Sequence, residues 1–147
     1  MFRYELLSIP SEITLTNESL DAVFSWVAKH VPHAQNGIIN IAFIDDELMQ
    51  TLNREYRWID KTTDVLSFHY FDEYSIVTED EIAGEIVLSY SKILSQALEH
   101  GHTKEKETQI LVLHGLLHIL GLDHESDEDY KIMWKYEEKI RSLITPT

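Results

Sequence analysis

The chain has 147 residues, of which 44% are hydrophobic and 26% charged, with a formal net charge of −14 at pH 7 and no cysteine. Length and composition predict one globular domain over residues 1–147, without disulfides or thiolate metal ligands. The acidic charge excludes a broad basic surface for nucleic acids, so an RNA substrate would need a local basic patch, a metal or a partner protein.

The first half of the chain predicts, in order, an edge strand, a helix, a core strand and a second helix. Apolar residues recur at helical spacing in the first helix, whereas β-branched residues dominate the core strand. Acidic residues that open the second helix suit the positive end of its dipole. The expected positions are about Phe2–Ile9, Asn17–His30 with Thr16 as N-cap, Ile38–Ile44, and a segment opened by Asp45 and Asp46.

The second half predicts two more core strands followed by three helices. The acidic stretch Asp72–Glu81 between these strands is expected to form a solvated loop or hairpin connection, and Gly84 marks a bulge or a close backbone approach. The strands are expected at Val65–Phe71 and Ile82–Leu88. The first helix is expected to begin at Ser89 or Ser91 and to end at about His100, the second to be opened by Thr103, and the last to follow Ser126. The order predicts an α+β single domain with a mixed β-sheet of about four strands packed with about five helices.

No apolar run in the sequence approaches the roughly 20 residues that cross a bilayer. The first residues also lack the basic and apolar pattern of a secretory signal. The absence of cysteine suits a reducing compartment. We therefore expect a cytoplasmic protein without a membrane partner.

The segment His114–His124 is the most informative part of the chain. His114 and His118 lie four residues apart, so on a helix both imidazoles share one face and can reach a single ion. Gly121 can take the left-handed conformation that ends a helix, and the chain can then bring His124 up as a third ligand. Three ligands leave one position open on a tetrahedral zinc. The pattern predicts one catalytic Zn²⁺ per chain at the end of a central buried helix.

Two alternatives apply to this histidine segment. The histidines could be core residues whose polar atoms other groups satisfy, but an unpaired buried polar group costs ~1–3 kcal/mol, and a metal satisfies all three at once. Metzincin peptidases share the spacing, yet zinc peptidases place a glutamate after the first histidine, where this chain has Gly115. The usual glutamate route of peptide hydrolysis is therefore not supported. The glycine is also expected to leave space beside the metal for a bulky substrate.

Arg57 and Glu85 are further candidate site residues. Arg57 ends a predicted helix, where it could complement the helix dipole or bind a phosphate. For a lone arginine, we favour the interaction with the dipole. Glu85 lies in an apolar strand and needs a partner. It could pair with Arg57, orient a ligand histidine, or face solvent on a half-exposed strand.

Several other polar residues near the predicted site have local interpretations. Asp64 could hold the rim of a site, although a turn cap is the favoured interpretation, and Asp123 could support His124 or cap the helix end. The remaining histidines have no ligand spacing to the triplet and are interpreted as ordinary: His30, His33, His69, His100 and His102.

Four sequence blocks, taken in order, resemble the YbeY family of bacterial endoribonucleases. The blocks are Leu52-Asn53-x-x-Tyr56-Arg57, Thr63-Asp64-Val65-Leu66-Ser67-Phe68, Gly84-Glu85-Ile86 and His114-Gly115-x-x-His118-x-x-Gly121-x-Asp123-His124. They cover about Leu52 to His124, and the total length also fits. His69 stands where the family commonly has proline, Glu85 where aspartate is common, and Leu122 where an aromatic is common, which could alter groove shape and substrate preference.

The resemblance implies a zinc-dependent, single-strand-specific endoribonuclease that acts in rRNA maturation, notably at the 3′ end of 16S rRNA, and in ribosome quality control. It implies zinc on His114, His118 and His124, and an active-site arginine at Arg57. It also implies single-stranded RNA or rRNA as substrate, small-subunit components or an assembly GTPase as partners, and no DNA. Two other classes stay open, a zinc metallopeptidase-like hydrolase and a ribosome-assembly factor with a structural metal.

Overall fold

The computed structural model describes residues 1–122 and residue 138, and this part of the chain contains four strands and four helices. The strands are β1 (Arg3–Leu6), β2 (Ile38–Ile44), β3 (Val65–His69) and β4 (Ile82–Ser89). The helices are α1 (Asn17–His30), α2 (Asp46–Arg57), α3 (Tyr90–His100) and α4 (Lys104–Ile119). The α+β order is the predicted one, with four helices seen against about five expected, and the helix predicted after Ser126 lies outside the described residues.

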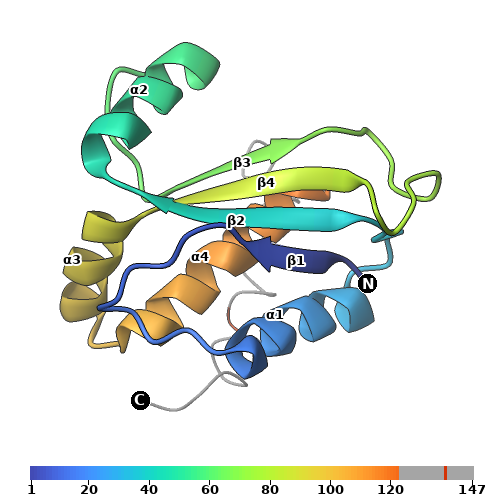
Figure 1. Cartoon of the computed structure of the whole chain (residues 1–147), viewed down its shortest axis with the longest axis horizontal. Helices are drawn as coiled ribbons and strands as arrows, with labels where there is room; N and C mark the ends of the chain where they lie inside the picture. The colour runs from blue at the N-terminus through green and yellow to red at the C-terminus, as the bar shows by residue number, and fades with distance from the viewer. Residues whose placement is uncertain (123–137, 139–147) are drawn as a thin grey trace.

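The four strands form one mixed sheet in the order β1-β2-β4-β3 (Figure 1). Strands β1, β2 and β4 run parallel, and β3 pairs antiparallel with β4. The parallel strands β1 and β2 are joined through α1, as a parallel pair requires a crossover. Strands β1 and β3 therefore form the two edges of the sheet.

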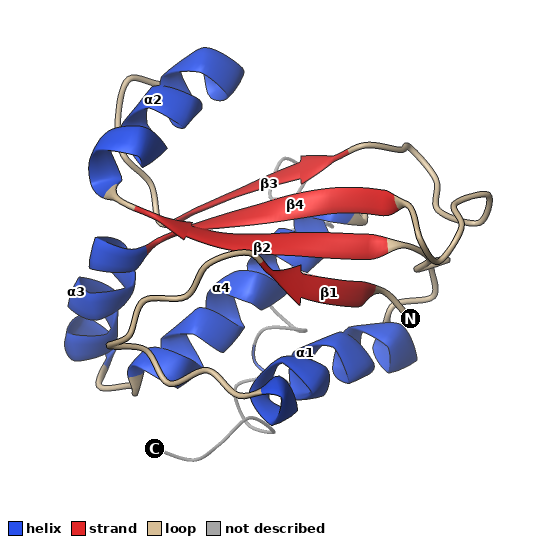
Figure 2. Cartoon of the chain, viewed as in Figure 1, coloured by secondary structure: helices blue, strands red, loops and turns tan. Residues whose placement is uncertain are grey.

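Helices α1 and α4 cover one face of the sheet, whereas α2 lies on the other side (Figure 2). The main core lies between the sheet and these two helices, and its fully buried side chains include Phe24, Leu20, Ile39, Ile41, Ile86, Leu113 and Leu116. A second, smaller cluster of Met49, Leu66 and Val87 lies beneath α2. None of the helices within residues 1–122 combines the length and apolar character needed to cross a membrane.

Each helix begins at a side-chain cap that the sequence predicts. The oxygen of each cap accepts a hydrogen bond from the backbone N–H three residues on, which satisfies a donor that the first helical turn cannot. The caps and their oxygen-to-nitrogen distances are Thr16 (3.1 Å), Asp45 (2.8 Å), Ser89 (3.3 Å) and Thr103 (3.0 Å).

The connection between β3 and β4 departs from the expected solvated loop. Tyr74 and Val77 are each only 4% exposed and belong to the main core. The Tyr74 ring packs edge-on against Phe2 at 5.3 Å between centroids, and its hydroxyl donates to the carbonyl oxygen of Ile119 at 3.4 Å. The acidic composition of the connection gave no sign that these two side chains are buried. Both attach the connection to the core, and Tyr74 also bonds it to the end of α4.

Gly84 follows a bulge and is required by a close backbone approach, the two features that the sequence predicts here. The register between β2 and β4 shifts so that Ile38 pairs with Ile82 while Ile39 pairs with Gly84, which leaves Ala83 as the extra residue. A Cβ at Gly84 would lie 2.5 Å from the carbonyl oxygen of Phe68 on β3.

Gly84→Ala is therefore expected to lower the free energy of unfolding by about 3 kcal/mol, because backbone atoms must move to admit the methyl group. Urea denaturation followed by circular dichroism measures this loss. Gly101→Ala is the matched control, since Gly101 has a φ of +69° but open space around its Cβ position. It should cost only about 1 kcal/mol of backbone strain. An equal loss in both variants would contradict this account.

Candidate active site

Helix α4 carries His114 and His118 one turn apart, and both side chains are partly buried. Four residues of helix advance about 6 Å and return to the same face. The helix is otherwise buried nearly all round, as its apolar sequence predicts. This burial fixes the two imidazoles relative to the sheet.

The end of α4 has the chain reversal that the sequence predicts at Gly121. Gly121 has a φ of +88°, and its N–H donates to the carbonyl oxygen of His118 at 2.9 Å. The N–H of Leu122 donates to the carbonyl oxygen of Leu117, also at 2.9 Å. These two bonds form a Schellman motif. Residues Asp123 and His124, the predicted support and third ligand, lie outside the described residues.

Gly115 has a packing role that the sequence did not reveal. A Cβ at this position would lie 2.9 Å from two carbon atoms of the Ile86 side chain on β4. Ile86 therefore occupies the Cβ direction of Gly115, while Gly115 itself lines the cleft next to His118. The expectation that the glycine leaves space for a bulky substrate stays a prediction. Glycine instead lets α4 approach the sheet closely between the two histidines.

Arg57 and His118 line one small cleft, although they come from different helices. The cleft has a volume of about 140 Å³ and is lined by Arg57, Val65, Leu66, Ser67, Gly115 and His118. The Nη2 of Arg57 donates to the carbonyl oxygen of Ser67 on β3 at 2.9 Å. Arg57 also lies in the last turn of α2, where its charge suits the dipole. The two sequence interpretations of Arg57 are thus compatible.

The residue after Arg57 has an unusual backbone. Trp58 ends α2 with a φ of 58° and ψ of 29°, the left-handed conformation. Among non-glycine residues within the described ranges, Trp58 alone has a positive φ. Its side chain is 90% exposed. A bulky residue held in this conformation stores strain of about 1–2 kcal/mol, as residues near functional sites often do.

Glu85 has a different partner from the ones considered first. No ion pair joins Glu85 to Arg57 in the part of the chain that the structure describes. Burial raises the pKa of Tyr70, and the Glu85 carboxylate, which accepts a hydrogen bond from the Tyr70 hydroxyl, raises it further. Tyr70 therefore remains a hydrogen-bond donor at neutral pH.

Asp64 joins secondary-structure elements rather than forming the rim of the cleft. Its carbonyl oxygen accepts from the N–H of Ser89 at 2.9 Å. Its carboxylate accepts from Nε2 of Gln96 on α3 at 3.3 Å and from the hydroxyl of Thr63 at 3.4 Å. These bonds hold the start of β3 against α3.

The donor set on α4 fits a transition metal. Two half-buried imidazoles lie one turn apart on α4, and one of them, that of His118, lines the cleft. Imidazole nitrogen is a preferred ligand of zinc. The Schellman motif turns the chain directly after them, as a third ligand from the following residues requires.

A second group of candidate metal ligands was missed by the sequence reading. His100, His102 and Glu107 each offer a ligand atom, and these atoms all lie within 4.8 Å of one another, so the group could hold a metal ion. The interpretation of His100 and His102 as ordinary histidines is therefore incomplete. The spacing of these histidines to His114 gives no indication of a shared metal. Their spacing to each other and to Glu107, across the turn at Gly101, is the signal that could have predicted this group.

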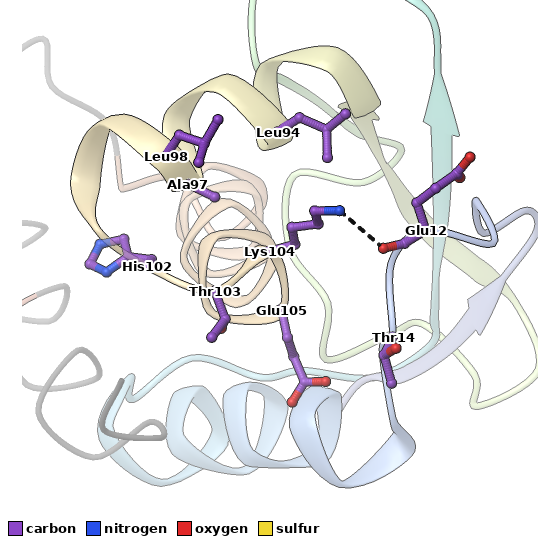
Figure 3. A pocket seen from close by; sticks show the side chains of 9 residues that line it. All are labelled: Glu12, Thr14, Leu94, Ala97, Leu98, His102, Thr103, Lys104 and Glu105. Carbon is purple, nitrogen blue, oxygen red and sulfur yellow. Dashed lines mark hydrogen bonds between the residues drawn. The ribbon is translucent and has the colours of Figure 1, made fainter.

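A larger pocket of about 830 Å³ lies away from the Arg57 cleft, between the loop before α1, α3 and the start of α4 (Figure 3). In this pocket Lys104 Nζ donates to the carbonyl oxygen of Glu12 at 3.5 Å. His102 lies on its wall. Neither Arg57 nor His118 lines this pocket, so its size alone does not mark the reaction site.

Comparison with known proteins gives consistent matches along most of the chain. The family model described as Endoribonuclease YbeY matches residues 8–145. A protein of Carboxydothermus hydrogenoformans named Endoribonuclease YbeY is 44% identical over 108 residues, covering 74% of this chain and 73% of its own length. A protein of the same name from Desulforamulus reducens is 38% identical over 139 residues, covering 92% and 89%.

A solved structure has a similar fold. The solution structure of a protein from Thermotoga maritima matches with a TM-score of 0.59 and 27% sequence identity, covering 97% of this chain and 91% of the other. The family model and the curated relatives both span most of the chain. This chain therefore belongs to the Endoribonuclease YbeY family.

Proposed function

We propose that this protein is a zinc-dependent, single-strand-specific endoribonuclease of rRNA maturation, acting at the 3′ end of 16S rRNA and in ribosome quality control. The observation that carries the proposal is the shared cleft of Arg57 and His118. A phosphodiester held there would contact a fixed cation on one side and the imidazole face of α4 on the other. The whole chain, residues 1–147, acts as one catalytic domain in this proposal.

The residues have distinct roles. His114, His118 and His124 would hold one zinc ion, which when bound supplies a Lewis acid to the phosphodiester. Arg57 would bind a non-bridging phosphate oxygen and stabilise the charge that builds there in the transition state. Its bond to the Ser67 carbonyl fixes the guanidinium, which has five N–H donors and so can bind a phosphate at the same time.

Exposed aromatic side chains near the cleft support a preference for single strands. Tyr56 is 63% exposed, Trp58 is 90% exposed and Tyr70 is 52% exposed. Tyr56 flanks Arg57 in sequence and packs edge-on against Phe68 of β3 at 5.3 Å. Unpaired bases stack on such rings, whereas bases within a duplex are already stacked on each other.

Trp58→Gly is expected to change stability and RNA binding in opposite directions. Glycine relieves the left-handed strain, so unfolding should cost about 0.5–1 kcal/mol more. Loss of the indole should weaken binding of single-stranded RNA by roughly 1–3 kcal/mol. Thermal denaturation and fluorescence anisotropy measure the two effects. Ile76→Ala is the control, because Ile76 is 79% exposed in the β3–β4 connection. Unchanged RNA affinity in Trp58→Gly would remove Trp58 from the binding surface.

The charge of the chain supports action through partners. A protein with a formal charge of −14 repels free RNA, since affinity rests mainly on neutralised phosphates. Components of the small ribosomal subunit, or an assembly GTPase, would deliver the RNA to the cleft in the cytoplasm. DNA is not among the ligands that we propose.

Elemental analysis combined with an RNA assay tests the proposal. We expect about one tightly held zinc per chain in freshly purified protein, and cleavage of single-stranded but not duplex RNA that a chelator abolishes and zinc restores. Zinc with peptide hydrolysis and no RNA cleavage would favour a peptidase-like hydrolase. Zinc with binding to ribosomal particles but no cleavage would favour an assembly factor with a structural metal.

A further inference from the structure

We propose that His100, His102 and Glu107 form a second metal site, which binds one divalent transition-metal ion such as Zn²⁺ and clamps the junction of α3 and α4. Their ligand atoms lie within 4.8 Å of one another. Nδ1 of His100 already lies 3.0 Å from Oε1 of Glu107. This inference does not depend on RNA cleavage, because it concerns only metal binding and stability.

The backbone at this junction holds the three residues in place. Gly101 has a φ of +69° and ends α3. Its N–H donates to the carbonyl oxygen of Leu98, and the N–H of His102 donates to the carbonyl oxygen of Ala97 at 2.9 Å. The next residue, Thr103, caps α4 and accepts from the N–H of Glu107 at 3.0 Å through its carbonyl oxygen. Two linked caps therefore fix the histidines beside the first turn of α4.

The chemistry of the group selects the class of metal. Two imidazoles and one carboxylate suit zinc, cobalt or nickel, whereas magnesium and calcium prefer oxygen ligands alone. The Glu107 side chain is only 2% exposed, so its charge has little water around it and gains from a cation. The same three-ligand set, two histidines and a glutamate, holds zinc with one open position in other proteins.

The distances allow a metal after a small adjustment. Zinc bonds of about 2.0–2.2 Å place the ligand atoms of a tetrahedral site about 3.3–3.6 Å apart. The ligand atoms must therefore close from separations of up to 4.8 Å, by at most about 1.5 Å. The His100 side chain is 45% exposed and can turn without disturbing the core. Because of this adjustment, we expect weaker binding here than at a site already assembled.

This site is separate from the proposed catalytic one. Glu107 precedes His114 by seven residues, which is two helical turns on nearly the same face and about 10 Å along the axis. Side chains that project in parallel from one face over this distance do not converge on a single ion. One long helix thus carries a metal group near each end, and the one near its start joins α4 to α3.

Metal titration of a chain without the catalytic ligands tests the inference. The His114→Ala/His118→Ala protein, stripped with a chelator, is titrated with Zn²⁺ by calorimetry and with Co²⁺ by visible absorption. We expect about one equivalent to bind, with the absorption of a low-coordinate cobalt site. Adding His100→Ala/His102→Ala, or Glu107→Gln, should weaken binding by more than tenfold, since even losing a partner of a ligand costs about 10–100-fold.

Matched controls separate a built site from stray histidines. His33→Ala in the same background removes an exposed histidine outside the group and should leave the titration unchanged. If the background variant does not fold, the wild-type chain should bind two equivalents and His100→Ala/His102→Ala one. Excess zinc should then raise the melting temperature of the wild type by more than that of the variant. No binding by the folded background variant, or equal binding after loss of both histidines, would overturn the second site.

Discussion

Replacing both His114 and His118 with alanine is expected to remove the proposed catalytic zinc and to slow RNA cleavage by about a thousandfold or more. A Lewis-acid metal contributes several kcal/mol to stabilising the transition state, and about 4 kcal/mol corresponds to a thousandfold change in rate. The two residues supply adjacent ligands from one helix face, so loss of both leaves His124 without its partners. Elemental analysis and a single-turnover cleavage assay measure the two losses together.

The control for this variant is His69→Ala. His69 is an exposed histidine at the end of β3, in the same strand that lines the cleft. It should retain both zinc and cleavage. If the double variant keeps cleaving at the wild-type rate, then the activity belongs to a contaminant or to another site. Circular dichroism must show that the variants keep the wild-type helix content for either result to count.

Arg57→Ala is expected to separate metal binding from catalysis. Removing one preorganised cation or donor at a developing charge costs about 10²–10³-fold in rate. The α4 histidines are untouched, so the zinc content should not change. Arg57→Lys should not restore the rate, because an ammonium cannot reproduce the planar guanidinium that bonds Ser67 and a phosphate at once.

Arg54→Ala is the matched control for Arg57. Arg54 lies in the same last turn of α2 but forms an exposed ion pair with Asp60 at 3.6 Å. An exposed pair of this kind contributes little to stability. Full activity in Arg57→Ala would show that Arg57 serves only the helix dipole and is no part of the catalytic site.

Most elements could be predicted from the sequence because their signals are local. Thr16 and Thr103 cap their helices through bonds to residues three positions away, and the β-branched run of β2 marks a core strand on its own. The histidine pair is local in the same sense, since its spacing lies within one helix. The burial of Tyr74 and Val77 was not predicted, because the acidic residues around them dominate the composition of the connection and indicate a solvated loop. These two side chains nevertheless reach the core.

The site itself could be predicted only in part because its halves meet through tertiary packing. Nothing in the sequence alone places Arg57 beside His118, since this requires β3 to run along the sheet edge between α2 and α4. Gly115 carries no local signal for its contact with Ile86. The grouping of His100 and His102 with Glu107 could not be predicted from local spacing alone. It depends on the left-handed turn at Gly101, which brings Glu107 close to the two histidines.

The two walls of the cleft have very different resistance to local opening. Helix α4 has twelve buried residues and passes through the main core, so His114 and His118 move only when the whole fold opens. Helix α2 buries only Met49 and Asn53 and projects from the body of the molecule (Figure 1). Mild denaturant should therefore release Arg57 first, leaving an inactive protein that still holds its metal. We therefore expect loss of activity and loss of fold to be two separate events in this molecule.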